Sequence, residues 1–200
     1  MPLDPILRNV ASELQTERLL LRTPRAGDGE IVHEAVLATL DDLRAWPASL
    51  PWAMAAPSVP ASETYCRQSA AEFIKRTSLV YLAFDRQGSL VVSLSLHSID
   101  WIVPKFELGF WCRAGRQRQG LTTEATAALM RYAFDSLGAR RVEAFPDEAN
   151  AGSRGVCEAI GMQLEGTLRN DRVTPDGESR STCVYAAIAP ARGSVRHPAS

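Results

Sequence analysis

Residues 116–125 constrain the fold of this chain more than any other stretch. A β-rich run, residues 105–113, precedes them. Apolar residues then recur at the spacing of one buried helix face: Ala125, Leu129, Met130, Ala133, Phe134 and Leu137. The first N–H groups of a helix have no partner within it, and the helix dipole adds positive charge there. We therefore predict a strand-to-helix junction that binds an anion such as phosphate.

The rest of the chain divides into short strands and helices around this junction. Further strands are expected at residues 18–22, 79–84, 90–97, 140–145, 162–172 and 179–188. Helices are expected after Gly29, from Ser62 as cap, and from Asn150 as cap. In the second of these helices, Tyr65, Phe73 and Ile74 are the candidates for the buried side. A strand, the central helix and a strand in succession predict a crossover to a parallel neighbour.

Length and composition predict one soluble globular domain. The chain has 200 residues, of which 46% are hydrophobic and 22% charged, enough for a full core without disulfides or metal. We expect the domain to span residues 1–189. Residues 190–200 carry two prolines and no apolar pattern, so they are predicted to form a flexible tail.

Charge and cysteine usage exclude several classes of function. The 22 basic and 23 acidic residues are mixed along the chain, which argues against nucleic acid and anionic membrane as partners. The four cysteines form no CxxC pair, so no metal site is predicted. The chain shows no signal peptide and no apolar run of membrane-spanning length. A cytoplasmic protein with reduced thiols is the expectation.

The anion site alone does not identify the ligand. A loop with one glycine is common between a strand and a helix, and this one lacks the Gly-Lys-Ser/Thr ending of nucleotide-binding P-loops. Asn150 and Ser153 strengthen the prediction, because they begin a second helix after a second strand and can face the same cleft. A phosphate-binding domain for some other nucleotide stays open at this point.

A set of motifs in a fixed order narrows the choice. They are Glu107-Leu-Gly-Phe-Trp111, Arg118-Gln-Gly-Leu-Thr-Thr-Glu-Ala125, Asn150-Ala-Gly-Ser153, Glu158-Ala-Ile-Gly-Met162, Glu165-Gly-Thr-Leu-Arg169, Asp176-Gly177 and Tyr185. Together they resemble the GNAT superfamily of N-acetyltransferases, and within it the RimJ/RimL type, over residues 17–188.

The resemblance implies a mixed α/β fold and a reaction. The fold would have a central sheet of six or seven strands, splayed between the fourth and fifth, with about four flanking helices. The reaction would transfer an acetyl group directly from acetyl-CoA, without metal, to a primary amine on a peptide N-terminus or a small molecule. The protein would be a monomer or homodimer. A non-catalytic acyl-CoA-binding or regulatory module is the alternative, and a longer acyl donor stays open.

The resemblance also implies which residues bind the cofactor. The loop residues expected to hold the pyrophosphate are Gln117, Arg118, Gln119, Gly120, Leu121, Thr122 and Thr123. Thr122 departs from the family, which has glycine or alanine there. The strand edge implied for the pantetheine amides consists of Phe110, Trp111 and Cys112, with Asn150 opposite. The backbone N–H of Trp111 or Cys112 is the implied donor to the oxyanion.

Three residues are the candidates for catalysis. Ser153 is the implied acid for the leaving thiolate, with Cys157 second, where many relatives have tyrosine. Capping of the helix is the structural alternative for Ser153. Glu107 is the implied base, and pairing with an arginine is its structural alternative.

Other bases stay open, among them His97 and water, because the base position of the RimL type falls on Arg172, which accepts no proton. Trp46, Trp52 and Met54 are predicted to line an acceptor pocket, with core packing as the alternative. Glu124 is assigned to the dipole of the central helix.

Overall fold

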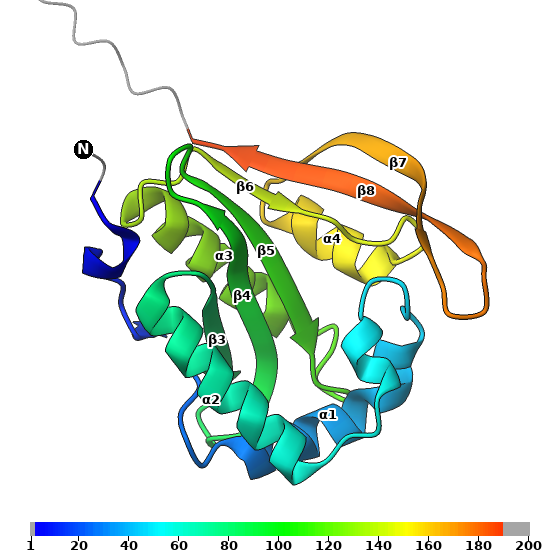
Figure 1. Cartoon of the computed structure of the whole chain (residues 1–200), viewed down its shortest axis with the longest axis horizontal. Helices are drawn as coiled ribbons and strands as arrows, with labels where there is room; N and C mark the ends of the chain where they lie inside the picture. The colour runs from blue at the N-terminus through cyan, green and yellow to red at the C-terminus, as the bar shows by residue number, and fades with distance from the viewer. Residues whose placement is uncertain (1–2, 190–200) are drawn as a thin grey trace, which may run out of the picture.

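A computed structural model describes residues 3–189 of the chain (Figure 1). The strands are β1 (Glu13–Gln15), β2 (Leu20–Arg22), β3 (Leu79–Phe84), β4 (Leu90–Asp100), β5 (Lys105–Cys112), β6 (Arg141–Ala144), β7 (Gln163–Val173) and β8 (Ser179–Ile188). The α-helices are α1 (Gly29–Arg44), α2 (Val59–Lys75), α3 (Leu121–Asp135) and α4 (Ala151–Ala159). Short 3-10 turns lie at Pro5–Leu7 and Pro51–Met54.

All eight strands form one sheet, in the order β1-β2-β3-β4-β5-β6-β8-β7. The expected mixed α/β fold with four helices is confirmed. The predicted count of six or seven strands is wrong, because the short strand β1 was not expected. That strand has only three residues and no apolar alternation, so it forms because the adjacent turn sets it antiparallel to β2. The predicted parallel pairing holds between β5 and β6.

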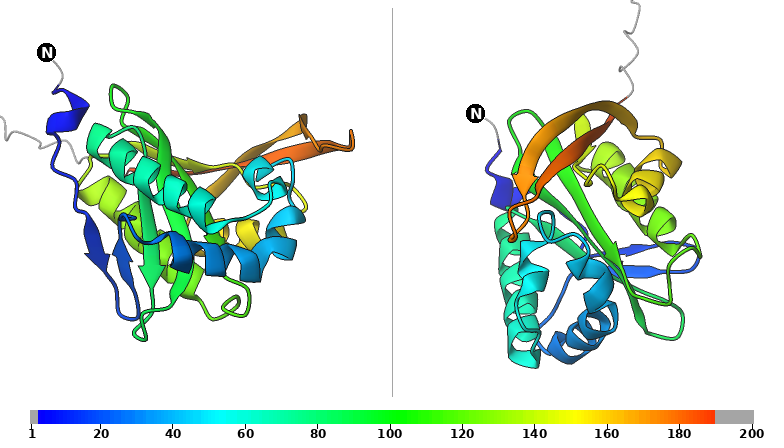
Figure 2. Two further views of the ribbon diagram at one scale, coloured as in Figure 1. Left: turned by 60° about the horizontal axis from the view of Figure 1, so that its bottom comes forward. Right: turned by 90° about the vertical axis from the view of Figure 1, so that its right-hand side faces the viewer.

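Two helices cover each face of the sheet (Figures 1 and 2). The buried side chains of α1 and α2 form a small core with Leu82, Phe84 and Leu90. On the other face, α3 packs Leu129 and Ala133 into the main core. This arrangement leaves the loop between α1 and α2 beside the same face of β4 and β5 as those two helices.

Helix α2 differs from its prediction at its start and on its buried side. Its cap is Ser58, whose hydroxyl oxygen accepts a hydrogen bond from the Ala61 N–H (3.2 Å), and not Ser62, which lies inside the helix. Phe73 is buried as predicted, but Ile74 is 62% exposed and Tyr65 is 38% exposed. Apolar spacing therefore identified the helix but misplaced two of its three supposed core residues.

The sheet opens between β5 and β6, which are the fourth and fifth of the expected strands, so the splay lies where it was predicted (Figure 1). The two strands pair only from Lys105–Arg141 to Glu107–Glu143. Beyond Glu107, β5 continues to Cys112 along β4 alone. The edge of β5 that faces β6 thus offers backbone groups to a ligand.

The strands β7 and β8 form a long hairpin at the far edge of the sheet, and it extends past the helices (Figure 2). A turn at Asp176-Gly177 joins the two strands, with Gly177 at φ 90° and its N–H donating to the Thr174 carbonyl (2.9 Å). Across residues 3–189, none of the helices has the length and apolar character that a bilayer crossing requires. The boundary of the domain at residue 189 stays a prediction, and the predicted tail, residues 190–200, lies outside the described residues.

Candidate active site

The start of α3 provides an anion site built from backbone. Gly120 takes the left-handed conformation (φ 74°) that turns the chain from the loop into the helix. The first hydrogen bond of the helix runs from the Glu124 N–H to the Gly120 carbonyl (3.0 Å). The N–H groups of Leu121, Thr122 and Thr123 therefore have no acceptor within the helix, as an anion site requires.

Side chains hold the loop in front of α3 in place. Arg116 pairs with Asp85 of the β3–β4 turn, so its charge is already compensated. Gln117 donates to Asp42 of α1 (2.8 Å), and Gln119 donates back to the Gly115 carbonyl (3.1 Å). Of the two loop arginines, Arg118 is the one that lines the cavity beside this loop.

Glu124 does not cap α3. Its carboxylate accepts hydrogen bonds from the Thr16 hydroxyl (2.6 Å) and from the Arg18 backbone N–H (2.9 Å), and it pairs with the Arg18 side chain (2.5 Å). It thereby fastens the β1–β2 turn to the first turn of α3. The assignment to the helix dipole alone is corrected, because these contacts come from a distant part of the chain.

We call the cavity beside this loop the donor cavity. It has a volume of about 370 Å³ and lies between β5, the start of α3 and α4. The predicted cofactor residues that line it are Phe110, Trp111, Cys112, Gln117, Arg118, Gly120, Thr122, Thr123, Asn150 and Ser153. Gln119 and Leu121 do not line it, since Gln119 turns back to Gly115 and Leu121 is buried.

The open edge of β5 presents alternate N–H groups. The Arg113 N–H donates to the Val91 carbonyl of β4 (2.9 Å). Since N–H groups alternate along a strand, the N–H of Trp111 also points to β4, whereas those of Phe110 and Cys112 point to the open edge. This direction favours Cys112 over Trp111 as the oxyanion donor that the sequence left open.

Asn150 and Ser153 meet the donor cavity from α4. The Asn150 side-chain oxygen accepts a hydrogen bond from the Ser153 N–H (2.9 Å), so the asparagine caps the helix. The cap needs only the oxygen of Asn150, whose amide nitrogen is still a donor. The cap uses the backbone N–H of Ser153, so the Ser153 hydroxyl is not the capping group.

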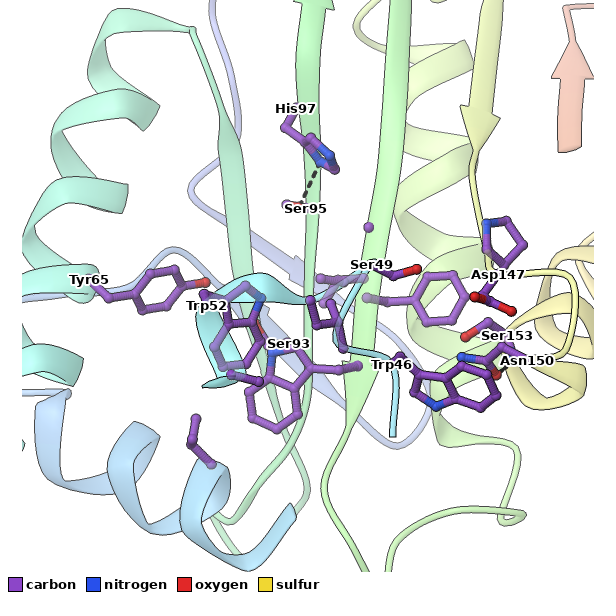
Figure 3. Close-up of a pocket in the computed structure, with 18 of the residues that line it drawn as sticks. Trp46, Ser49, Trp52, Tyr65, Ser93, Ser95, His97, Asp147, Asn150 and Ser153 are labelled. Atoms are coloured by element: carbon purple, nitrogen blue, oxygen red, sulfur yellow. Dashed lines mark hydrogen bonds between the residues drawn. The ribbon is translucent and has the colours of Figure 1, made fainter. Parts of the chain in front are cut away.

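A second, larger cavity, which we call the acceptor cavity, adjoins the donor cavity. Its volume is about 690 Å³, and it lies between the sheet and the loop that joins α1 to α2 (Figure 3). Glu107, His97, Ser153 and Cys157 line it. The two cavities share six lining residues: Trp46, Leu50, Phe110, Trp111, Asn150 and Ser153. A donor group and an acceptor group can therefore meet at the splay of the sheet.

Two of the candidate bases form one hydrogen-bonded unit. His97 Nε2 lies 3.2 Å from Glu107 Oε1, and His97 Nδ1 lies 3.1 Å from Ser95 Oγ (Figure 3). Burial acts to raise the pKa of Glu107, but the bond and charge of His97, with smaller contributions from a Ser98 hydrogen bond and the charge of Arg172, hold that pKa below its usual value. The partner of Glu107 is thus a histidine and not an arginine. We call Ser95, His97 and Glu107 the proton relay.

Gly109 makes room for the proton relay. A Cβ at this position would lie 2.9 Å from His97 Cε1 and 3.3 Å from Ser95 Oγ, closer than such atoms normally approach. Glycine therefore lets the imidazole ring rest on the backbone of β5.

The two cysteines beside the cavities are weak acids. Burial raises the pKa of the Cys157 thiol to about 12, and Cys157 is fully buried. Burial also raises the pKa of Cys112, although a hydrogen bond with Thr122 and the charge of Arg116 oppose the rise. A thiol with a raised pKa carries little thiolate at neutral pH, so neither residue is a ready nucleophile.

The loop between α1 and α2 supplies the remaining wall of the acceptor cavity. Trp46 and Trp52 line it as predicted, but Met54 does not. Arg172 of β7 also lines it and donates to the Ser49 hydroxyl (3.0 Å), which joins the hairpin to the loop.

Several polar residues of the acceptor wall, among them Tyr65, Ser93 and Ser95, were not predicted to line it. Polar residues at every second position of β4 (Ser93, Ser95, His97) were an available signal. Asp147 also lines the cavity, and its buried carboxylate accepts from Arg180 (2.7 and 2.9 Å). Within residues 3–189, no three His, Cys, Asp or Glu side chains are placed to hold a metal ion.

Comparisons with known proteins agree with this geometry. A Bacillus subtilis (strain 168) protein named "Putative ribosomal N-acetyltransferase YdaF" is 37% identical over 83 residues. That match covers 42% of this chain and 45% of the relative, so the chain spans less than half the length of the curated relative it matches.

Two solved structures share the fold. RimL, a ribosomal L7/L12 α-N-protein acetyltransferase in complex with coenzyme A, has a TM-score of 0.80 at 22% identity, over 87% of this chain and 96% of its own. The microcin C7 self-immunity acetyltransferase MccE, in complex with acetyl-CoA and AMP, has a TM-score of 0.79 at 18% identity, over 86% and 93%. At these identities the likeness concerns the fold.

The sequence profile of the acetyltransferase (GNAT) domain matches residues 18–163, which include the loop before α3, the open edge of β5 and the start of α4. That match covers most of the chain and the elements that carry the two cavities, except β7, whose Arg172 lines the acceptor cavity. The chain belongs to the GNAT acetyltransferase family.

Proposed function

We propose that this protein transfers an acetyl group from acetyl-CoA directly to a primary amine, with both substrates bound at once. The observation that carries the proposal is that the donor and acceptor cavities meet at Phe110, Trp111, Asn150 and Ser153, where β5 and β6 part. Two solved structures with this fold support the donor, since one contains coenzyme A and the other acetyl-CoA.

The donor cavity fits acetyl-CoA at both of its polar parts. The N–H groups at the start of α3 and the guanidinium of Arg118 suit the pyrophosphate. Phe110 and Cys112 present two N–H groups at the open edge of β5; one suits an amide carbonyl of the pantetheine arm, which leaves the other for the acetyl carbonyl. Thr122 adds its hydroxyl to this wall in place of the glycine or alanine usual in the family.

Acetyl-CoA supplies a thioester whose carbonyl carbon accepts the amine nitrogen. As the N–C bond forms, the oxygen gains negative charge, which the Cys112 or Phe110 N–H at the open edge stabilises by donating a hydrogen bond. The C–S bond then breaks, and the sulfur leaves as a thiolate. The hydroxyl of Ser153, at the junction of the two cavities, donates a hydrogen bond to that sulfur.

The proton relay removes the proton from the amine. Glu107 is anionic at neutral pH because its pKa is lowered, and His97 stands between it and Ser95. A proton taken from the amine can thus be shared between imidazole and carboxylate, directly or through water. The charge of Glu107 also attracts the ammonium form of the acceptor into the cavity.

Direct transfer is favoured over an acetyl-enzyme. The raised pKa values of Cys112 and Cys157 leave both without the thiolate that an acyl carrier needs. Cys157 stays the weaker candidate for the leaving group as well, because it is fully buried and a thiol is a weaker hydrogen-bond donor than a hydroxyl.

The acceptor is a primary amine on a peptide N-terminus or a small molecule. The B. subtilis relative, by its name a ribosomal N-acetyltransferase, and RimL, an α-N-protein acetyltransferase, support a protein N-terminus. The four unpaired cysteines support a place in the cytoplasm, and a monomer or a homodimer is compatible with the proposal.

Release of free thiol from acetyl-CoA in the presence of amines tests the proposal. We expect Ser153→Ala to lower kcat by about tenfold to a hundredfold without loss of the α4 cap, and Cys157→Ala to change kcat by less than about threefold. Binding of CoA without thiol release for any peptide or small amine would instead indicate a non-catalytic module. A stable acetyl group on Cys112 or Cys157 in mass spectra would contradict direct transfer.

A further inference from the structure

The acceptor cavity is far larger than the reaction needs. Its 690 Å³ lies within the size range of pockets that enclose a drug-sized ligand, about 300–1,000 Å³. An amine on a small residue such as alanine or serine would occupy only the end beside Glu107 and Ser153. The rest of the volume extends away from the splay, between α1, α2 and β4.

The distant part of the cavity is apolar and aromatic. We call it the apolar chamber and define it by Val36, Leu40, Trp52, Ala61, Tyr65 and Ser93. Trp52 is 47% exposed and Tyr65 is 38% exposed, and both lie on the wall of the cavity. Figure 3 shows Tyr65 entering from α2 with its hydroxyl directed toward the centre of the cavity, where Trp52 lies. Aromatic surface of this kind binds apolar groups well.

Charge is confined to the other end. The charged side chains of the cavity wall are Glu107, Asp147 and Arg172, and His97 adjoins Glu107 in the proton relay. Asp147 pairs with Arg180, and Arg172 lies 3.8 Å from the Asp171 carboxylate and donates to Ser49. A charged group in the apolar chamber would lose part of its hydration without gaining an ion-pair partner from the residues that define the chamber, which is costly. The Tyr65 side chain is partly exposed, but burial of its hydroxyl raises the pKa of the phenol, although hydrogen bonds with Ser93 and Ser69 oppose the rise.

We propose that the acceptor carries a bulky apolar group, preferably an aromatic ring, on the carbon that bears the amine, and that this group fills the apolar chamber. The inference rests on the proposed function and adds the class of acceptor to it. The amine then lies beside the proton relay, and the ring lies between Trp52 and Val36. The hydroxyl of Tyr65, near Ser93, can form a hydrogen bond with a polar group at the tip of such a ring, as in a phenol.

The test compares acceptors that differ only in the side chain. We expect kcat/KM for phenylalaninamide and leucinamide to exceed that for alaninamide and serinamide by about tenfold or more, as hydrophobic pockets discriminate by this order. We also compare turnover of phenethylamine with turnover of two peptides that differ only in their first residue, phenylalanine or alanine. This comparison shows whether the amine belongs to a peptide N-terminus or to a free small molecule. Equal or better turnover of the alanine and serine acceptors would overturn the inference and leave the proposed function intact.

Filling the apolar chamber gives an independent test with a matched control. Val36→Trp, on the chamber side of α1, should lower kcat/KM for phenylalaninamide about tenfold and change that for alaninamide less than about twofold. Leu37→Trp adds the same group one residue along the helix, at a position 56% exposed and outside the cavity lining, and should change neither value. Ala61→Leu tests the chamber from α2 if Val36→Trp does not fold.

Calorimetric binding separates the two proposals. Suppose that phenylalaninamide binds to the CoA-saturated protein, that Val36→Trp weakens this binding, and that no amine gives thiol release. That result would refute the proposed function and support the apolar chamber as a binding site. Absence of both binding and turnover of apolar amines, in protein that binds CoA, would overturn the inference.

Discussion

The donor and acceptor cavities meet at one point of the sheet, but the groups that line them differ in kind. The donor cavity uses backbone groups: the first N–H groups of α3 and the open edge of β5. The acceptor cavity uses side chains, contributed by the loop between α1 and α2, by α2 and by the sheet. Backbone recognition suits a ligand that is the same in every family member, whereas side chains let the acceptor differ.

The largest effect is expected from a change on the donor side. Gly120→Asp forces a side chain onto a left-handed residue (φ 74°), whose Cβ would lie 3.4 Å from the Arg18 guanidinium. It also adds a carboxylate at the start of α3, beside the proposed pyrophosphate site. We expect the Kd for CoA, measured by calorimetry, to rise about a hundredfold or more, because charge repulsion replaces attraction.

The control for this prediction is Gly115→Asp. Gly115 is also left-handed (φ 77°) and lies in the same loop, but it does not line the donor cavity. It carries the same backbone strain and the same charge, so its Kd for CoA should change only a few-fold. Equal losses in the two variants would mean that strain, and not the anion site, explains the effect.

The next effect lies on the acceptor side. Glu107→Gln keeps the shape of the side chain and removes the carboxylate of the proton relay, so we expect kcat to fall about a hundredfold with little change in the KM for acetyl-CoA. Glu165→Gln removes a carboxylate of lowered pKa that lies on β7, bound to Arg141 and away from both cavities, and should leave kcat unchanged.

The pH profile adds a second readout for Glu107. Its folded pKa is lowered, so the wild-type carboxylate stays ionised down to below its ordinary value of about 4.3. Its contribution to stability is therefore present above that value and is lost as the pH falls through the lower, folded pKa. A loss of activity between pH 5 and 8 in the wild type must come from the amine or another group. An acid limb near pH 6 that disappears in Glu107→Gln would contradict this assignment.

The same division between backbone and side chains explains what the sequence could predict. The strand, loop and helix around Gly120 are local, so spacing and one glycine sufficed, and the central meander and the crossover followed from strand patterns. The wall of the acceptor cavity brings together Trp52, Tyr65, Ser93 and Glu107, which are far apart in the chain. Tyr65 has the helical spacing of a core residue, but its neighbours in space are a cavity and Ser93.

Local rules failed for the same reason elsewhere. Glu124 obeys the dipole argument for a first-turn carboxylate, yet its partners, Thr16 and Arg18, reach it only in the folded protein. The relay between His97 and Glu107 also requires the β4–β5 register, which places the two residues opposite each other. Sequence alone presented them as rival bases.

A smaller effect is expected where the backbone makes room for a side chain. Gly109→Ala would put a Cβ 2.9 Å from His97 Cε1, so the ring must move away from Glu107. We expect kcat to fall about tenfold, since proton transfer is sensitive to such shifts. Gly166→Ala, in β7, where a Cβ would meet nothing within 4 Å, is the control and should be neutral.

A double-mutant cycle shows whether the loss runs through the ring. In a His97→Ala background, Gly109→Ala should cost much less than it does in the wild type. Full additivity of the two changes would show that the new methyl group acts on the bound substrates and not on His97.

The smallest effect is expected at the contact that joins the hairpin to the acceptor loop. Ser49→Ala removes the hydrogen bond from Arg172 (3.0 Å), a charge-assisted contact at a partly exposed site, worth about 1 kcal/mol. The KM for the amine should rise about fivefold, because the loop that carries Trp46 and Trp52 loses its tie to β7, while the KM for acetyl-CoA stays unchanged. Ser49→Thr keeps the hydroxyl and should restore the amine KM. If Ser49→Ala instead weakened acetyl-CoA binding as much as amine binding, the two cavities would not be separable as donor and acceptor sides, because one contact of the acceptor loop would be setting both.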